Sequence, residues 1–240
     1  KVCGDRRVYL ERNLPRTRHI EAQIIGDGKK VLHMGARYCS VQIPGRSQKL
    51  VEEAVYPGQP FLSSLENEIL KKILAWEVKI GETADYKGVG TVEFLVDKAS
   101  NIYFLELNPR IQVEHTVTEM ITRVKGRVLN LIAEQLKVAA GAKLDYGQND
   151  ISFNGCAMEA RIVSMDPRHL IAHQSTIERY LPPWHVKNAT LHDGGLTEAF
   201  QSGRVRRYRL PPYDPMFAQL VAFGNNHIDA AQFLSNGLGC

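Results

Sequence analysis

The chain has 240 residues, 44% of them hydrophobic and 23% charged, a balance typical of a folded globular protein and not of a disordered or fibrous one. Its 30 basic and 26 acidic side chains leave a formal net charge of +4, an excess too small to indicate a nucleic-acid or membrane partner. Four widely separated cysteines without a C-x-x-C pair fit neither a zinc site nor a disulfide-stapled secreted domain. We therefore expect reduced thiols and an intracellular protein. We favour the cytoplasm over a mitochondrion or plastid, although the sequence leaves the compartment open.

The sequence as given predicts no membrane-spanning helix and no signal peptide. No apolar run reaches the roughly 18 residues that a membrane helix requires, and the N-terminus lacks the regions of a signal peptide. The chain begins at Lys1 rather than at a methionine. This start leads us to expect a fragment of a larger protein, although processing of a longer chain would give the same start.

Strand and helix patterns alternate in the first half of the chain. Residues 8–11 predict a strand, residues 19–25 alternate like a half-buried strand, and residues 31–34 predict the partner that returns beside it. A capping box from Ser63 to Glu66 opens a helix over 64–80, which Gly81 ends. The apolar residues of this helix recur at helical spacing: Leu65, Ile69, Ile73, Trp76 and Ile80.

The remaining elements indicate an α+β fold. Residues 91–96 and 102–107 predict a hairpin, and apolar spacing predicts a helix over 128–139 that Gly141 caps. After a polar stretch the pattern changes to short strands and turns, with breakers such as Gly194-Gly195, and a last helix near 228–235. We place a domain boundary near 145–151, which separates residues 1–145 from residues 151–240.

Two glutamates face each other in the predicted hairpin. With the connection at 97–102, Phe94 lies opposite Leu105 and Glu93 lies opposite Glu106, while the apolar side chains point to the buried face. Facing carboxylates destabilise a sheet unless a cation offsets them, and Mg²⁺ or Mn²⁺ suits oxygen ligands. Asn108, on the same face, supplies a third oxygen. The spacing alone is equally compatible with two solvated glutamates on an exposed sheet face.

Polar and apolar residues alternate again just downstream of the hairpin. An extended backbone after Asn108 projects Arg110, Gln112 and Glu114 to one side. The guanidinium can hold a planar oxyanion such as bicarbonate, and the carboxylate can accept its proton. An ordinary Arg–Glu pair on a surface strand remains the alternative.

Residues 104–120 closely resemble the signature around the active site of biotin carboxylases, which have the ATP-grasp fold. Other segments extend the resemblance over nearly the whole chain: residues 39–42, 48–54, 88–94, 134–141, 159–162 and 213–216. The resemblance implies an ATP-grasp C-terminal lobe in residues 1–145, followed by the family's C-terminal subdomain in 151–240. It also implies ATP-dependent carboxylation of biotin, with bicarbonate as the carbon source and carboxyphosphate as the intermediate.

The resemblance also implies a role for individual positions. The implied metal ligands are Glu93, Glu106 and Asn108, and the implied bicarbonate contacts are Lys49, Arg110, Gln112 and Val113. Glu114 corresponds to the general base, and Arg161 to the arginine that stabilises the enolate-like oxygen of biotin. The implied nucleotide contacts are Glu11, Arg12, Asn13, Leu14 and His19.

The same resemblance names ligands and partners. The ligands are ATP, Mg²⁺ or Mn²⁺, and biotin as a substrate carried on a protein. The partners are a biotin carboxyl carrier protein or domain and a carboxyltransferase component, and a homodimer is also compatible. The carboxyltransferase would select the final acyl acceptor, which this sequence does not specify.

The chain departs from the family's pattern in three places. Residues 43–47 form a longer loop in which Ser47 replaces a His or Asn, which leaves open both the nucleotide contact there and the aim of Lys49. Residues 122–128 are also longer, and Gln219 stands where a lysine is usual. No glycine-rich phosphate loop occurs in the sequence as given, so we expect this chain by itself to bind ATP weakly and to turn over poorly.

Two other functions stay open. Another ATP-grasp ligase, such as a carbamoyl-phosphate synthetase, would share the Glu–Glu–Asn metal site but would not need Arg110 together with Arg161. A non-catalytic scaffold derived from a carboxylase would retain magnesium–nucleotide binding and would lack bicarbonate-dependent ATPase activity.

Overall fold

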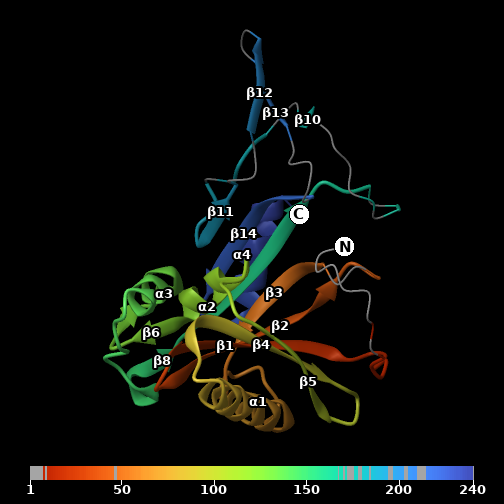
Figure 1. Cartoon of the computed structure of the whole chain (residues 1–240). Coiled ribbons are helices and arrows are strands. Elements are labelled where there is room, and N and C mark those ends of the chain that lie inside the picture. The colour runs from red at the N-terminus through yellow and green to blue at the C-terminus, as the bar shows by residue number, and fades with distance from the viewer. Residues whose placement is uncertain are drawn as a thin grey trace.

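A computed structural model shows a long twisted sheet flanked by helices (Figure 1). The structure describes residues 8, 10–45, 48–166, 168–169, 171, 176–177, 180–183, 185–193, 197–202, 205–209 and 215–239. The sequence features at Ser47, at Gly194-Gly195 and at residues 211–214 lie outside these ranges, as do Cys3 and Cys240. Cys39 and Cys156 are buried free thiols, as the sequence predicts for them.

The main sheet is antiparallel, and its strands carry several of the residues that the sequence predicts to be functional. In the described part of the chain it has eight strands in the order β11-β14-β9-β3-β2-β1-β4-β5. Their bounds are β1 (Arg18–Asp27), β2 (Val31–Gln42), β3 (Lys49–Val55), β4 (Lys87–Val96), β5 (Ile102–Asn108), β9 (Cys156–Val163), β11 (Ala189–His192) and β14 (Met216–Gly224). The mixture of this sheet with helices confirms the predicted α+β class.

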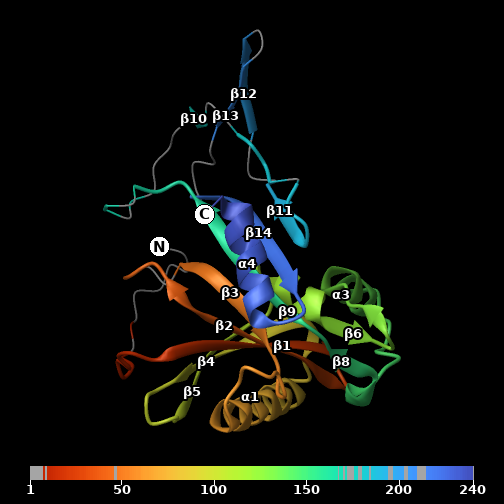
Figure 2. The ribbon, with the colours of Figure 1, turned by 180° about the vertical axis from the view of Figure 1, so that it is seen from behind.

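Helices cover both faces of the main sheet. Figure 2 shows α1 (Ser64–Thr83) and α4 (His227–Leu238), which pack on one face against apolar side chains such as Ile24 and Ala160. The other face carries α2 (His115–Ile121) and α3 (Leu131–Ala139), which pack against residues such as Ala54 and Ile25. Because successive side chains of a strand point to opposite faces, polar residues between these apolar ones line the α2 side.

Smaller elements complete the described fold. One small sheet has the order β7-β6-β8, and another has the order β10-β13-β12 and projects away from the main body (Figure 1). The bounds of these elements are β6 (Thr122–Val124), β7 (Arg127–Val128), β8 (Ile151–Phe153), β10 (Thr176–Ile177), β12 (Thr197–Ser202), β13 (Val205–Arg209) and a 3-10 helix (Gln148–Asp150). The extra residues predicted at 122–128 thus form the β6–β7 hairpin.

The helix predicted over 64–80 forms α1, and its N-terminal cap is confirmed. Ser63 accepts a hydrogen bond from the Glu66 backbone, and Glu66 reaches back to the Ser63 backbone. The predicted end at Gly81 is wrong, because the helix continues to Thr83 and buries Gly81, where an added Cβ would lie 2.8 Å from Val31 Cγ1. Glycine is therefore required here by close packing against β2.

The buried face of α1 also differs from the expected one. Leu65 and Trp76 are exposed, whereas Leu70, Leu74 and Glu77 are buried beside Ile69 and Ile73. The apolar residues of this helix occupy more than one face, so periodicity alone did not fix which one the sheet covers.

The β4–β5 hairpin confirms that Glu93 and Glu106 are paired, although the predicted pairing of Phe94 with Leu105 is wrong. Val96 pairs with Ile102 and Phe94 with Phe104, because the turn is closed at Asn101 rather than Ile102. A bulge between Glu93 and Phe94 then restores Glu106 to the position opposite Glu93. Leu105 consequently turns to the site, and Phe104 packs against Phe94 with ring centroids 6.3 Å apart.

Other predicted elements differ in extent. The strand predicted at 8–11 is absent from the described residues of that segment, and Val8 and Leu10 are almost fully exposed. β1 is buried on both faces rather than half-buried, because helices cover both sides of the sheet. The helix predicted from 128 begins at Leu131, where the Asn130 side chain caps it. The last helix is longer than predicted, because α4 begins at His227 and ends at Leu238.

The main sheet continues across the boundary predicted near 145–151. β3 and β9, which come from the two sides of that boundary, pair directly at Val51–Glu53. Among the described residues, no helix is long and apolar enough to cross a membrane.

Candidate active site

A cavity of about 610 Å³ lies on the α2 side of the main sheet, and it brings together residues far apart in the sequence. The predicted residues that line it are His19, Lys49, Glu93, Glu106, Asn108, Arg110, Gln112, Val113, Glu114 and Arg161. They come from β1, β3, β4, β5, β9 and the loop that follows β5. Residues 11–14, predicted to contact nucleotide, do not line this cavity and lie in the segment before β1, where Glu11, Arg12 and Asn13 are exposed.

The paired carboxylates converge on one amide that lines the cavity. The Asn108 Nδ2 atom donates to Glu93 Oε1 at 2.8 Å and to Glu106 Oε1 at 3.1 Å. Two carboxylates and an amide oxygen are the donors that Mg²⁺ and Mn²⁺ accept, and the two ends of an amide can exchange places by rotation. The three residues therefore fit a divalent cation.

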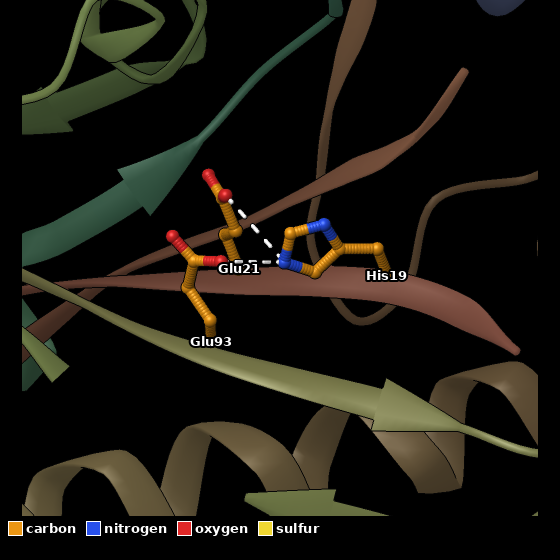
Figure 3. A group of neighbouring side chains, drawn as sticks. All are labelled: His19, Glu21 and Glu93. Atoms are coloured by element: carbon orange, nitrogen blue, oxygen red, sulfur yellow. Dashed lines mark hydrogen bonds and ion pairs between the residues drawn. The ribbon is translucent and has the colours of Figure 1, made fainter. Parts of the chain in front are cut away.

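His19 contacts this acidic group directly (Figure 3). Its Nε2 atom lies 2.7 Å from Glu93 Oε2 and 3.7 Å from Glu21 Oε1. The three side chains place potential ligand atoms within 4.8 Å of one another. The sequence predicted His19 as a nucleotide contact, and the structure brings it against a predicted metal ligand.

Glu93 remains ionised despite its burial. Burial raises its pKa, but hydrogen bonding from His19, the Lys49 charge and the Gln112 amide outweigh that effect and lower the pKa below its usual value. The Gln112 Nε2 atom donates to Glu93 Oε1 at 3.1 Å. The carboxylate is therefore available as an anionic ligand at neutral pH.

Lys49 connects the carboxylates of the site. Its ammonium group contacts Glu21, lies 2.8 Å from Glu114 Oε1 and lies 3.6 Å from Glu93 Oε1. The longer loop over 43–47 thus leaves Lys49 directed into the cavity. The two ends of this loop are joined by a hydrogen bond from the Ile43 backbone N–H to the Gln48 carbonyl.

Glu114 is held strongly in its anionic form. Burial raises its pKa, but Arg37, Lys49 and Arg161 outweigh burial and lower the pKa to about 2. Arg161 Nη2 lies 3.1 Å from Glu114 Oε2, opposite the oxygen that Lys49 contacts. Both oxygens of the Glu114 carboxylate are therefore paired with a cation.

Arg161 is fixed by a second carboxylate that the sequence did not identify. Its Nε atom donates to Glu52 Oε1 at 2.6 Å, and its Nη2 atom lies 2.5 Å from the same oxygen. Glu52 is fully buried, so this pairing aims the guanidinium at the cavity.

A buried arginine under the cavity was also missed. Arg37 is fully buried, and its guanidinium donates to Gln112 Oε1 at 2.7 Å and to Glu21 Oε2 at 3.3 Å. Its other acceptors are Gln23, Thr91 and Thr118. The available signal was the polar alternation of His19, Glu21 and Gln23 within an otherwise apolar strand. That pattern marks a polar face that needs a buried partner.

The loop after β5 turns rather than staying extended as predicted. The Arg110 N–H donates to the Asn108 carbonyl, the His115 N–H donates to the Gln112 carbonyl, and α2 begins at His115. Arg110, Gln112 and Glu114 nevertheless line one cavity. Arg110 is exposed, and among the described residues its guanidinium bonds only the Ile111 carbonyl, at 3.1 Å. An anion can therefore reach it.

Comparison with known proteins identifies the family. The family described as carbamoyl-phosphate synthase L chain, ATP binding domain, matches residues 1–146. The biotin carboxylase of Nostoc sp. is 37% identical over 98% of this chain and 48% of its own length. The mitochondrial propionyl-CoA carboxylase alpha chain of Sus scrofa is 36% identical over 98% of this chain and 30% of its own length.

Solved structures agree with the sequence comparison. The biotin carboxylase domain dimer of Hydrogenobacter thermophilus 2-oxoglutarate carboxylase, in complex with MgADP, ADP and bicarbonate, superposes with a TM-score of 0.78 at 35% identity. That match covers 95% of this chain and 46% of the other. The chain thus spans about half the length of the biotin carboxylases it matches. It belongs to the family of carbamoyl-phosphate synthase L chain ATP binding domains, and within that family it is a relative of the biotin carboxylases.

Proposed function

We propose that the protein containing this chain is a biotin carboxylase, which uses ATP to activate bicarbonate and transfers the carboxyl group to biotin on a carrier protein. One observation carries the proposal: a single cavity joins Lys49, Arg110 and Arg161 to the carboxylates of Glu93, Glu106 and Glu114. The biotin carboxylase names of the relatives support it. A ligase without a biotin step would not need Arg110 together with Arg161 in this cavity.

Arg110, Gln112 and Val113 are the proposed bicarbonate contacts. The exposed guanidinium of Arg110 supplies charge and two parallel donors for a planar oxyanion. The buried Arg37 donates a hydrogen bond to Gln112 Oε1 at 2.7 Å, and the Val113 carbonyl accepts a hydrogen bond from Gln219 at 2.9 Å. A rigid support of this kind positions a small anion without reorganisation when it binds.

Glu114 is the proposed general base, and its low pKa explains why it would act only with substrate bound. Lys49 and Arg161 suppress proton uptake while they bond the carboxylate. Anionic substrates would draw these two cations away from Glu114, and its pKa would then rise toward the range needed to accept a proton. Proton transfer is thereby tied to occupancy of the cavity.

The metal and nucleotide would complete the site. Glu93, Glu106 and Asn108 would hold Mg²⁺ or Mn²⁺, which supplies charge neutralisation for transferring phosphoryl groups. His19 would orient Glu93 through its 2.7 Å contact. We propose residues 1–145 as the ATP-grasp lobe and residues 151–240 as the C-terminal subdomain, and the family match ends at residue 146, near this boundary. A carboxyl carrier and a carboxyltransferase are the proposed partners.

ADP release by the full-length protein tests the function. We expect release that depends on both bicarbonate and free biotin, with carboxybiotin as product. Release that depends on bicarbonate but yields no carboxybiotin would favour another ATP-grasp ligase. Nucleotide binding without any bicarbonate-dependent release would favour a scaffold and would refute the proposal.

Two variants assign the roles within the cavity. Arg110→Met should raise the bicarbonate KM at least tenfold, because one lost charge-assisted contact costs about 1.5–3 kcal/mol. Lys98→Met, in the exposed β4–β5 turn, is the matched control and should leave the KM unchanged. Glu114→Gln should abolish biotin carboxylation and largely retain nucleotide binding, and unchanged carboxylation would remove Glu114 as the base.

A further inference from the structure

Two fully buried carboxyl groups lie directly opposite each other beneath Arg161. Glu52 on β3 pairs with Glu159 on β9, and directly opposed residues of neighbouring strands point to the same face. Glu52 Oε1 bonds Arg161, but Glu52 Oε2 has no hydrogen-bond partner among the described residues. Neither carboxyl belongs to the set of residues proposed to contact substrate.

The surroundings of Glu159 contain hydrogen-bond donors but few positive charges. Thr116 on α2 donates to Glu159 Oε2 at 3.0 Å, and the neutral Gln219 amide on β14 donates to Oε1 at 2.7 Å. The same Gln219 Nε2 atom donates to the Val113 carbonyl, so Glu159 is connected to the edge of the cavity.

The charged groups around the pair do not balance. Among the largest charge effects on the pair, the anions are the two carboxyls themselves and Glu114, and the cations are Arg161 on β9 and Lys49 on β3. The buried Arg37 on β2 also acts on Glu114, but its guanidinium donates to five other side chains. Arg161 is shared by Glu52 and Glu114, and Lys49 bonds Glu21 and Glu114. The Cys39 thiol on β2 is kept neutral, because burial raises its pKa. Two fully ionised carboxylates would therefore share too little positive charge for a site without water.

We infer that Glu52 and Glu159 form a carboxyl pair that retains one proton at neutral pH, held mainly by Glu159 and directed to the unpartnered Glu52 oxygen. Glu52 then stays anionic and holds Arg161, while the pair carries a single negative charge. Both residues are positioning residues for Arg161.

The titration behaviour agrees with this geometry. Burial, followed by the Glu52 charge, raises the pKa of Glu159 to about 8. Burial raises the pKa of Glu52 to about 7, against the opposing effect of Arg161. Because the two groups interact, these values belong to the pair rather than to either residue.

Loss of the shared proton should lower the positive electrostatic potential around Arg161, although the guanidinium itself stays charged. The second negative charge would lie next to the guanidinium and would reduce its attraction for the developing oxyanion. This step rests on the proposed function. We expect kcat/KM for biotin in the full-length protein to fall roughly tenfold as pH rises from 7 to 9.5.

Glu159→Gln tests the pair, because glutamine resembles the protonated acid and cannot ionise. We expect its kcat/KM, normalised to its own value at pH 7, to lose this alkaline decline. Glu53→Gln, on the opposite face of β3 and hydrogen-bonded to His227, is the matched control and should keep the decline. An alkaline decline in Glu159→Gln at the same pH as in the wild type would overturn the inference.

A stability measurement separates this inference from the proposed function. A carboxyl whose pKa is raised on folding stabilises the fold fully below about pH 4.5, and that stabilisation is lost as pH rises through about 8. Between pH 5 and 9 the wild type should lose several degrees more in Tm than Glu159→Gln. Equal losses would refute the retained proton even if biotin is carboxylated. Unequal losses would support it even if no biotin-dependent activity is found.

Discussion

Replacement of Arg37 by methionine should show how strongly the site depends on a cation that never reaches the cavity. The guanidinium is fully buried and donates to five side chains, including Glu21 and Gln112. Removal of one partner of a buried ion pair costs about 3–5 kcal/mol, because the remaining charge is left without compensation. Glu21 keeps its contact with Lys49, so we expect a loss of about 3 kcal/mol, at the lower end of this range.

Urea unfolding measures this loss through the shift of the midpoint at constant slope. Arg110→Met is the matched control, because its exposed guanidinium should contribute less than about 0.5 kcal/mol to stability. Arg37→Lys should give an intermediate loss, since it keeps the charge and loses the fork of donors. A loss under about 1 kcal/mol for Arg37→Met, equal to that of the control, would refute the reasoning.

Three further predictions concern stability. Glu114→Gln should reduce the loss of stability on acidification. The pKa of Glu114 is lowered to about 2, so its carboxylate contributes stability that is present above about pH 4.5 and lost as pH falls through about 2. Urea unfolding at pH 5 and pH 3 should therefore show a smaller difference in stability for the variant than for the wild type. Ser63→Ala should cost about 1 kcal/mol through loss of the α1 capping box, whereas the exposed Ser64→Ala should stay within about 0.5 kcal/mol. Glu77→Met should raise stability at pH 7 by about 1–3 kcal/mol, because both Glu77 oxygens are buried and have no hydrogen-bond partner among the described residues. Burial raises the pKa of Glu77, so the stability that its neutral form contributes is lost as pH rises. A lower unfolding midpoint than that of the wild type would contradict this prediction.

Local signals in the sequence determined much of the architecture. The Ser63–Glu66 capping box fixed the start of α1, because its two hydrogen bonds span only four residues. The opposition of Glu93 and Glu106 was also predicted, although two errors cancelled. The turn is one residue shorter than assumed, and the bulge at β4–β5 adds the residue back. Irregularities of this kind depend on packing such as Phe94 against Phe104, which a single strand pattern does not reveal.

The residues that support the site were decided by the tertiary structure. Arg37, Glu52 and Glu159 lie inside strands rich in apolar residues, and nothing local shows which side chains they meet. Their partners come from distant strands: Glu52 from β3 meets Arg161 from β9 across 109 positions of sequence. The sequence by itself determined which chemistry-bearing side chains the chain possesses and which of them share a strand face, because side-chain alternation is local. The assembled sheet decided which charges lie within bonding distance, and therefore which carboxyls ionise and which retain a proton, because pairing and burial depend on the whole fold.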